Sequence, residues 1–205
     1  MNPAPARPDA PAGAVRPARR WVPVWGVLGV IVVTVLGGFV TAAALPAVEA
    51  APVTVGGSVT VRPLPGWSVV QTDRADVPAP SGGTVEVAFA QLSRGNGALD
   101  VVAIPDLGLP TDQAAAFYLD AVLRTQLERP SVSALHDLVL ASGLAAVRFG
   151  YIGTEPSSGD AIEGSVTVTE GRSGVAAFFD GWASEGQLEL IEDELETMIG
   201  EAEVR

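Results

Sequence analysis

Cysteine and lysine are both absent from this chain of 205 residues, and histidine occurs once, at position 136. Without cysteine the chain can form no disulfide, no thiolate nucleophile and no cysteine-ligated zinc or iron–sulfur site. Without lysine it has no Schiff-base amine and no P-loop lysine for phosphates. A single histidine also excludes a zinc site with two histidine ligands. We therefore expect no metal site and no cofactor.

Charged residues are missing from residues 21–45, where there is no Asp, Glu, Lys, Arg or His. A bilayer core about 30 Å thick needs roughly 20 apolar residues in a helix, so this run is long enough to span it with some tilt. Trp21 and Trp25 lie at its start, where amphipathic rings favour the membrane interface, and Pro46 cannot continue a helix. We predict a transmembrane helix over residues 21–45.

Basic residues predict the orientation of this span. Residues 1–20 carry four arginines against one acid, whereas the first basic residue after the span is Arg62. The positive-inside rule therefore places the N-terminus in the cytoplasm and everything after Leu45 outside the cell membrane. Because residues 1–20 are rich in proline and alanine and show no apolar period, we expect them to be a disordered tail.

A cleaved secretory signal is the alternative to a retained anchor. Val48 and Ala50, followed by Ala51, place small residues at the two positions that signal peptidase inspects. The apolar region of a signal peptide is usually about 7–15 residues long, which is much shorter than this run. The length favours the anchor, but cleavage after Ala50 stays open. Either way, the rest of the chain is expected outside the cytoplasm.

The remaining residues are strongly acidic. Residues 46–205 hold 8 arginines and 23 aspartates or glutamates, which gives a net charge of −15. Such a surface repels nucleic acids, so we expect no nucleic-acid partner, and a well-solvated surface explains the acidity by itself. Residues 46–57, with two prolines and two glycines, predict a linker, and residues 58–205 predict one α+β domain.

Most of this domain shows the alternation of β-strands. Short alternating runs predict strands at residues 58–62, 84–92, 99–104, 144–152, 162–169 and 175–182. Between the second and third of these lies Arg94-Gly95-Asn96-Gly97. Because Asn-Gly permits positive φ, this tetrapeptide predicts a β-hairpin turn, and a sheet built from such hairpins is antiparallel.

Two helices are also predicted. Thr111 is the expected N-cap of a helix that runs to about Glu128 and stops before Pro130. A second helix is expected from Ser184, which forms a capping-box pattern with Gln187. Its apolar residues form one stripe at helical spacing: Leu188, Ile191, Leu195, Met198 and Ile199. The predicted fold class is α+β, a mostly antiparallel sheet covered by two helices and preceded by one transmembrane helix.

The stretch from Val59 to Trp67 reads VTVRPLPGW, and it carries the Pro-Gly-Trp motif at residues 65–67. With the order of strands and helices that follows, residues 53–201 resemble the PsbP-like fold superfamily. That superfamily includes the extrinsic protein of photosystem II and actinobacterial lipoproteins and anchored proteins. The heavy use of Ala, Gly, Pro and Val, with arginine as the only strong base, is typical of a GC-rich, actinobacterial genome. The resemblance implies a domain that binds or scaffolds other proteins and is not usually an enzyme.

No catalytic set stands out among the polar residues. His136 is the only base available to a Ser-His-acid triad, and the acid beside it in the chain would point to the opposite face of a strand. The acid pairs Asp160 with Glu163 and Asp73 with Asp76 lie near loops. They could serve a calcium site or a glycosidase, but solvated loops explain them equally well.

These observations predict a non-catalytic, single-pass membrane-anchored interaction or accessory domain of the cell envelope, with an unknown envelope protein as its partner. The alternative is a small-molecule or lipid-binding domain with a cavity between sheet and helix. A third hypothesis, an envelope hydrolase, requires a cleft with two facing acids of raised pKa. Trp67 and Trp182 are expected in the core, and either becomes a candidate partner contact if it is exposed.

Overall fold

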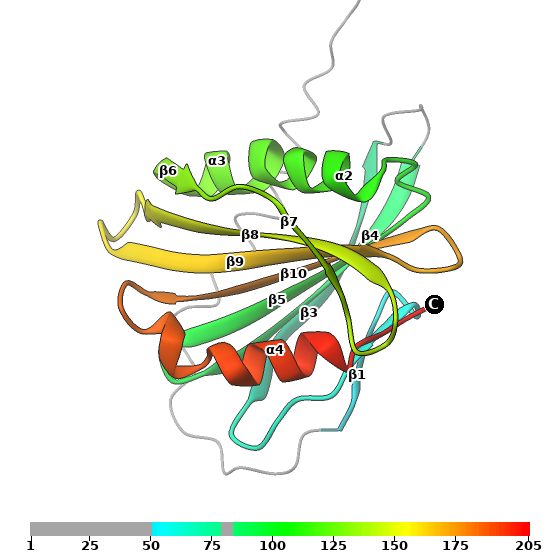
Figure 1. Ribbon diagram of the computed structural model, residues 1–205, viewed down its shortest axis with the longest axis horizontal. Coiled ribbons are helices and arrows are strands. Elements are labelled where there is room, and N and C mark those ends of the chain that lie inside the picture. Colours follow the sequence, from blue (N-terminus) through cyan, green and yellow to red (C-terminus); the bar gives the residue numbers. More distant parts are fainter. Residues whose placement is uncertain (1–50, 79–83) are drawn as a thin grey trace, which may run out of the picture.

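The computed structural model describes residues 51–78 and 84–205, whose strands form two antiparallel sheets (Figure 1). The smaller sheet has the order β1-β2-β11, with β1 at Val53–Val55, β2 at Val59–Val61 and β11 at Glu203–Val204. The larger sheet has the order β3-β4-β5-β10-β9-β8-β6, and β7 pairs with β8 beside β6. Its strands are β3 (Ser68–Pro78), β4 (Thr84–Arg94), β5 (Gly97–Pro105), β6 (Glu128–Val132), β7 (His136–Val139), β8 (Ala145–Thr154), β9 (Ala161–Glu170) and β10 (Val175–Ser184).

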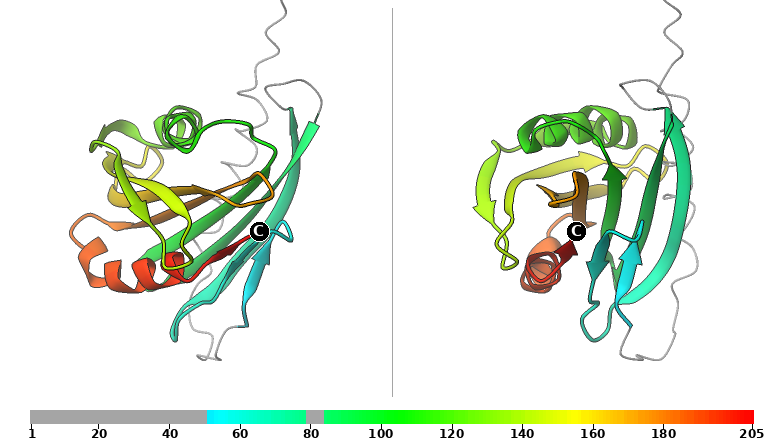
Figure 2. Two further views of the ribbon diagram at one scale, coloured as in Figure 1. Left: turned by 45° about the vertical axis from the view of Figure 1, so that its right-hand side comes forward. Right: turned by 90° about the vertical axis from the view of Figure 1, so that its right-hand side faces the viewer.

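Helices cover both faces of the large sheet. On one face α2 (Thr111–Tyr118) continues as a π-helical turn, η2 (Leu119–Leu123), and then as α3 (Arg124–Gln126). On the other face a 3₁₀ turn, η3 (Leu188–Leu190), leads into α4 (Glu192–Gly200). Figures 1 and 2 show α2 and α4 on opposite sides of the sheet, with the small sheet on the α4 side.

The two faces of the sheet carry two separate hydrophobic clusters. Along β10, Ala176 and Phe178 face α2, while Ala177 and Phe179 face α4 and the small sheet. Since successive side chains of a strand alternate in direction, one strand contributes to both clusters. The α4 stripe is confirmed as a buried face, with Leu195, Met198 and Ile199 each 3% exposed or less.

The predicted hairpin turn is confirmed. β4 ends at Arg94, β5 begins at Gly97, and these two residues pair, so Gly95 and Asn96 form a two-residue loop. Gly95 has a φ of 58°, which glycine adopts without the clash that a Cβ introduces. The strands predicted at residues 162–169 and 175–182 are also confirmed and lie within β9 and β10.

The predicted boundaries of the first helix are wrong at both ends. Thr111 is the first helical residue rather than the N-cap, which is Pro110 and makes no side-chain capping bond. The last helical residue is Gln126, and Glu128 already pairs with Thr154 as the first residue of β6. Pairing with β8 therefore outweighs the local helix preference of this segment.

The predicted start of the last helix is also wrong. Ser184 is the final residue of β10, where it pairs with Ile162, so it cannot cap a helix. Gln187 lies before the 3₁₀ turn, and α4 begins only at Glu192. β10 extends two residues beyond the predicted end at 182 because the ladder with β9 continues through Ala183 and Ser184 and satisfies their backbone groups.

These findings correct the predicted fold class. The described residues form a mostly antiparallel β structure in which two short helical segments are a minor part, rather than the predicted α+β domain. None of the helices in residues 51–78 and 84–205 is long and apolar enough to cross a membrane. The tail at 1–20 and the span predicted at 21–45 lie outside the described residues, and β1 lies inside the expected linker at 46–57.

Candidate functional site

A row of polar side chains crosses four neighbouring strands of the large sheet. Gln71 on β3 lies opposite Gln91 on β4, Gln91 lies opposite Asp100 on β5, and Asp100 lies opposite Asp180 on β10. Directly opposed residues of antiparallel strands project from the same face. The row therefore runs from an edge strand to the centre of the sheet, and ends where Val166 opposes Asp180 on β9.

Asp180 lies at the inner end of this row and accepts two tyrosine hydrogen bonds. Tyr118 on α2 donates to Asp180 Oδ2 over 2.9 Å, and Tyr151 on β8 donates to Asp180 Oδ1 over 2.8 Å. Tyr118 also stacks on Phe178, with ring centroids 5.3 Å apart. Gly164 makes room for the second tyrosine, since a Cβ at that position would lie 2.5 Å from Tyr151 Cζ.

Asp100 has its own pair of donors. Gln91 Nε2 donates to Asp100 Oδ1 over 2.8 Å, and Trp182 Nε1 donates to Asp100 Oδ2 over 3.1 Å. Each oxygen of both carboxylates thus accepts a hydrogen bond from the protein. We call Asp100, Asp180, Tyr118, Tyr151, Gln91 and Trp182 the aspartate cluster.

Burial changes the proton affinity of this cluster. It raises the pKa of Asp100 to about 6, and hydrogen bonds from Gln91 and Trp182 oppose that rise. Burial, and then the nearby charge of Asp100, raise the pKa of Asp180 to about 7, against the opposing effect of its two tyrosine donors. Burial likewise raises the pKa of both tyrosines well above the usual value, so they remain neutral donors. The cluster holds protons on carboxyl groups close to neutral pH.

Two facing acids of raised pKa are one part of what the hydrolase hypothesis requires. Asp100 is 7% exposed and Asp180 is 3% exposed, so neither lies in an open cleft. A general acid or base must come within hydrogen-bond distance of its substrate. Because the protein already occupies all four carboxylate oxygens, the described geometry favours a structural, proton-dependent role over catalysis.

The two tryptophans singled out from the sequence occupy different environments. Trp67 is 2% exposed, and its Nε1 donates to Glu194 Oε2 on α4 over 2.7 Å. The sequence made Trp67 a candidate partner contact only if its side chain were exposed, and it is buried. Trp182 is half-buried and belongs to the aspartate cluster. Whether Trp182 also contacts a partner stays a prediction.

The other polar candidates do not converge. Exposed to solvent are Asp73, Asp76, His136 and Asp160. Glu163 is half-buried and accepts a hydrogen bond from the backbone of Leu188 over 2.8 Å, which ties β9 to the turn before α4. Within residues 51–78 and 84–205, no group of three or more His, Asp or Glu residues is arranged to hold a metal ion.

A cleft of about 630 Å³ opens at the end of the molecule where the chain terminates. It lies between the β7–β8 turn, the β9–β10 turn and strand β11. Its lining residues are Ser142, Leu144, Arg172, Ser173, Glu203, Val204 and Arg205. We call it the C-terminal cleft. It combines two apolar side chains with two hydroxyls and two guanidinium groups.

Tertiary contacts hold the three walls of this cleft together. The backbone N–H of Ser142 donates to the carbonyl oxygen of Gly200 at the end of α4 over 3.3 Å. The hydroxyl of Ser173 donates to the carbonyl oxygen of Arg205. Gly171 permits the close approach of β11, since a Cβ there would lie 2.6 Å from that same oxygen. The cleft is therefore a product of packing between segments that are distant in sequence.

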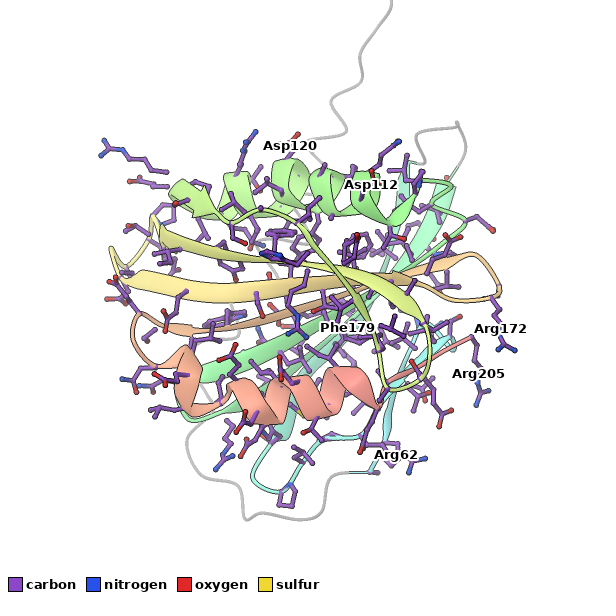
Figure 3. All side chains as sticks on the ribbon, viewed as in Figure 1. Arg62, Asp112, Asp120, Arg172, Phe179 and Arg205 are labelled. Carbon is purple, nitrogen blue, oxygen red and sulfur yellow. The ribbon has the colours of Figure 1, made fainter. Side chains whose placement is uncertain are left out.

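Positive charge is concentrated around the C-terminal cleft of this acidic domain. Figure 3 shows Arg62, Arg172 and Arg205 on the same side of the molecule. Arg62 and Arg205 share a single acid, Glu203, at 3.5 and 3.6 Å. Arg172 is exposed and forms no ion pair with any described residue. Two guanidinium groups thus share one carboxylate side chain, and Arg172 adds a third guanidinium group that has no acid of its own.

Neither the aspartate cluster nor the C-terminal cleft was identified from the sequence. Asp100 and Asp180 each stand alone in an apolar strand, and an acid in the middle of a buried strand is the one signal that could have drawn attention to them. Arg172 lies in a predicted turn, and Arg205 has no marked neighbour. Only the strand register and the chain path bring these residues together.

No protein-family model matches the chain, and no curated protein is detectably similar to it. Among solved structures, a protein of unknown function from Pseudomonas aeruginosa, PA94, is similar at 15% sequence identity, with 74% of this chain and 94% of that chain covered. The TM-score of 0.41 is low, and the similarity carries no argument about function.

Proposed function

We propose that this chain is a non-catalytic binding domain of the cell envelope, attached to the membrane by residues 21–45 and presented outside the cytoplasm. The C-terminal cleft is the observation that carries the proposal. Its volume of about 630 Å³ lies in the range of ligand pockets, and it brings Arg172, which forms no ion pair with a described residue, beside Arg205, which shares Glu203 with Arg62. Attachment and orientation rest on the sequence of residues 1–45.

The packing of the α2 face supports binding in the C-terminal cleft rather than between sheet and helix. Tyr118 of α2 stacks on Phe178 and bonds Asp180, and Leu123 beyond it is 1% exposed. Side chains of the helix therefore fill the region in which the alternative hypothesis placed a small-molecule cavity. The resemblance to the PsbP-like superfamily, whose members bind or scaffold other proteins, agrees with a binding role and stays a proposal.

Topology is the first part of the proposal to test. The full chain with a C-terminal epitope tag would be expressed in an actinobacterial host, and protease would be added to intact spheroplasts. We expect the tagged portion to be degraded while a cytoplasmic marker survives, because the positive-inside rule places it outside. A protected tag, or full-length protein in the cytosolic fraction, would contradict the proposal.

Binding at the cleft is tested by crosslinking in the same cells. Arg172→Glu with Arg205→Glu reverses two cleft charges, and Arg129→Glu is the matched control. Arg129 is exposed, forms no ion pair with a described residue and does not line the cleft. It belongs to β6, which Figure 1 shows at the opposite end of the large sheet from the C-terminus. We expect a defined adduct in the wild type and the control that is lost from the double variant. Identical adducts in all three proteins would place binding elsewhere.

A further inference from the structure

We propose that the C-terminal cleft recognises an anionic group, a carboxylate or a phosphate, that is joined to a short apolar chain. The inference rests on the proposed function, since it names the class of ligand that the same cleft takes. It follows from the combination of one guanidinium group without an ion pair, a second with a long ion pair, hydroxyls and apolar side chains in one open site. The source of the anion is either a lipid headgroup or a small soluble molecule, and the experiment separates the two.

The charges of the cleft favour an anion. Of the charged residues that line the cleft, Arg172 and Arg205 are positive and Glu203 is negative. Arg62, which is outside the lining, also pairs with Glu203 and offsets part of its charge. The rest of the domain is acidic, so an anion finds its favourable field here rather than elsewhere on the described surface.

The donors of the cleft suit oxygen ligands. A guanidinium group presents a planar set of N–H donors that match a carboxylate or a phosphate in two-point contact. Arg172 has no acid to satisfy it among the described residues, and Arg205 shares its only acid with Arg62 at distances of 3.5 Å or more. A bound anion would therefore displace no strong ion pair. Ser142 lies in the same lining and offers a further hydroxyl.

The apolar part of the lining specifies the rest of the ligand. Leu144 is half-buried and Val204 is buried, and both border the cleft beside the arginines. Both also pack against the core beneath the cleft, so a short alkyl chain would cover only the parts of them that remain exposed, which an inorganic anion would leave uncovered. Apolar burial contributes about 25 cal/mol per Å², so the chain adds affinity that the anion alone lacks.

Isothermal titration calorimetry on the full chain in phosphatidylcholine nanodiscs tests this inference, with hexyl phosphate as the probe. The variants are Arg172→Gln with Arg205→Gln, and Arg129→Gln as the control. We expect saturable binding to the wild type and to the control, and affinity at least about tenfold weaker in the double variant, because two charge-assisted contacts are removed. Near-identical unfolding curves of the three proteins would show that the substitutions leave the fold intact.

Two further probes separate charge from apolar contact. Hexanol, which lacks the anion, should show no saturable binding, and inorganic phosphate should bind at least about tenfold more weakly than hexyl phosphate. No binding of hexyl phosphate, or equal binding by the double variant, would overturn the proposal. Equal binding of inorganic phosphate would overturn the apolar half of it.

The source of the anion is resolved by changing the nanodisc lipid. If the headgroup of a neighbouring lipid fills the cleft, phosphatidylglycerol nanodiscs should weaken hexyl phosphate binding to the wild type by competition. Unchanged affinity would identify a soluble anion, and either result supports the shared chemistry. The two proposals can also fail separately. A cytoplasmic location in the protease assay would contradict the proposed function, but the purified chain would still bind hexyl phosphate in the calorimeter if this inference holds.

Discussion

Asp100 on β5 lies directly opposite Asp180 on β10, and both carboxylates are buried inside the large sheet. Two like charges in such a position repel each other, and each also loses hydration. Four neutral side-chain groups offset these costs by donating one hydrogen bond to each carboxylate oxygen. The relationship makes the stability of the fold depend on pH near neutrality.

We expect the free energy of unfolding to fall as pH rises from 5 to 8. The raised pKa values, about 6 for Asp100 and about 7 for Asp180, mean that the folded protein holds protons that the unfolded chain has already released. Their stabilising effect is complete below pH about 4, where the unfolded chain is protonated too, and is lost as pH rises through the folded values. Urea unfolding should give a loss on the order of 2–4 kcal/mol from pH 5 to pH 8.

Asp180→Asn should reduce this pH dependence. The amide cannot ionise, so a proton-linked group disappears and Asp100 loses its nearest like charge. The slope of unfolding free energy against pH should fall by about half or more. Asp112→Asn, at an exposed position on α2, serves as the control and should keep the wild-type slope. An unchanged slope in Asp180→Asn would show that the pair does not titrate in this range.

Tyr151→Phe should destabilise the fold more at pH 8 than at pH 5. Its hydroxyl donates to Asp180 over 2.8 Å and lowers the pKa of that carboxyl, so its removal matters most when the carboxylate is charged. A lost hydrogen bond to a buried charged group costs about 1.5–3 kcal/mol. Urea unfolding at the two pH values measures the difference, and an equal cost at both would mean that Asp180 does not change its charge between them.

Gly164→Ala should disturb the aspartate cluster through packing alone. The new Cβ would lie 2.5 Å from Tyr151 Cζ and 2.8 Å from the carbonyl oxygen of Gly181, so both the ring and the backbone of β10 must move. We expect a loss of about 2 kcal/mol or more. Gly150→Ala on β8 is the matched control, because its nearest neighbour would be 3.7 Å away. A similar loss in both variants would attribute the effect to strand glycines in general.

Trp67→Phe should weaken the attachment of α4. The indole is buried and its Nε1 donates to Glu194 over 2.7 Å, so the variant loses that bond and leaves a small gap. We expect a cost of about 1–3 kcal/mol in chemical unfolding. A double-mutant cycle with Glu194→Ala isolates the bond, and a coupling energy near zero would assign the whole cost to packing.

The sequence predicted what depends on local chemistry and period. The hairpin turn at residues 94–97, the alternation in β9 and β10 and the apolar stripe of α4 were all predicted correctly, because backbone conformation and side-chain direction follow from neighbouring residues. Within that turn, Gly95 rather than the Asn-Gly pair supplies the positive φ. The errors of prediction came at Glu128 and Ser184, where pairing with a distant strand competes with a local helix signal. Local patterns carry no information about that competition.

What the sequence by itself determined is the hairpin turn at residues 94–97, the strands β9 and β10 and the buried face of α4, together with the acidity of the domain and the charge-free run at residues 21–45. Only the tertiary structure decided that Asp100 meets Asp180 and that Arg172 meets Arg205 at one cleft. The physical reason is register. A one-residue shift of β5 or β10 would turn Asp100 or Asp180 to the other face, and the register is set by packing across the whole sheet rather than by the residues beside them. Arg172 and Arg205 lie outside the strands, and the packing of β11 against the β9–β10 turn brings them together.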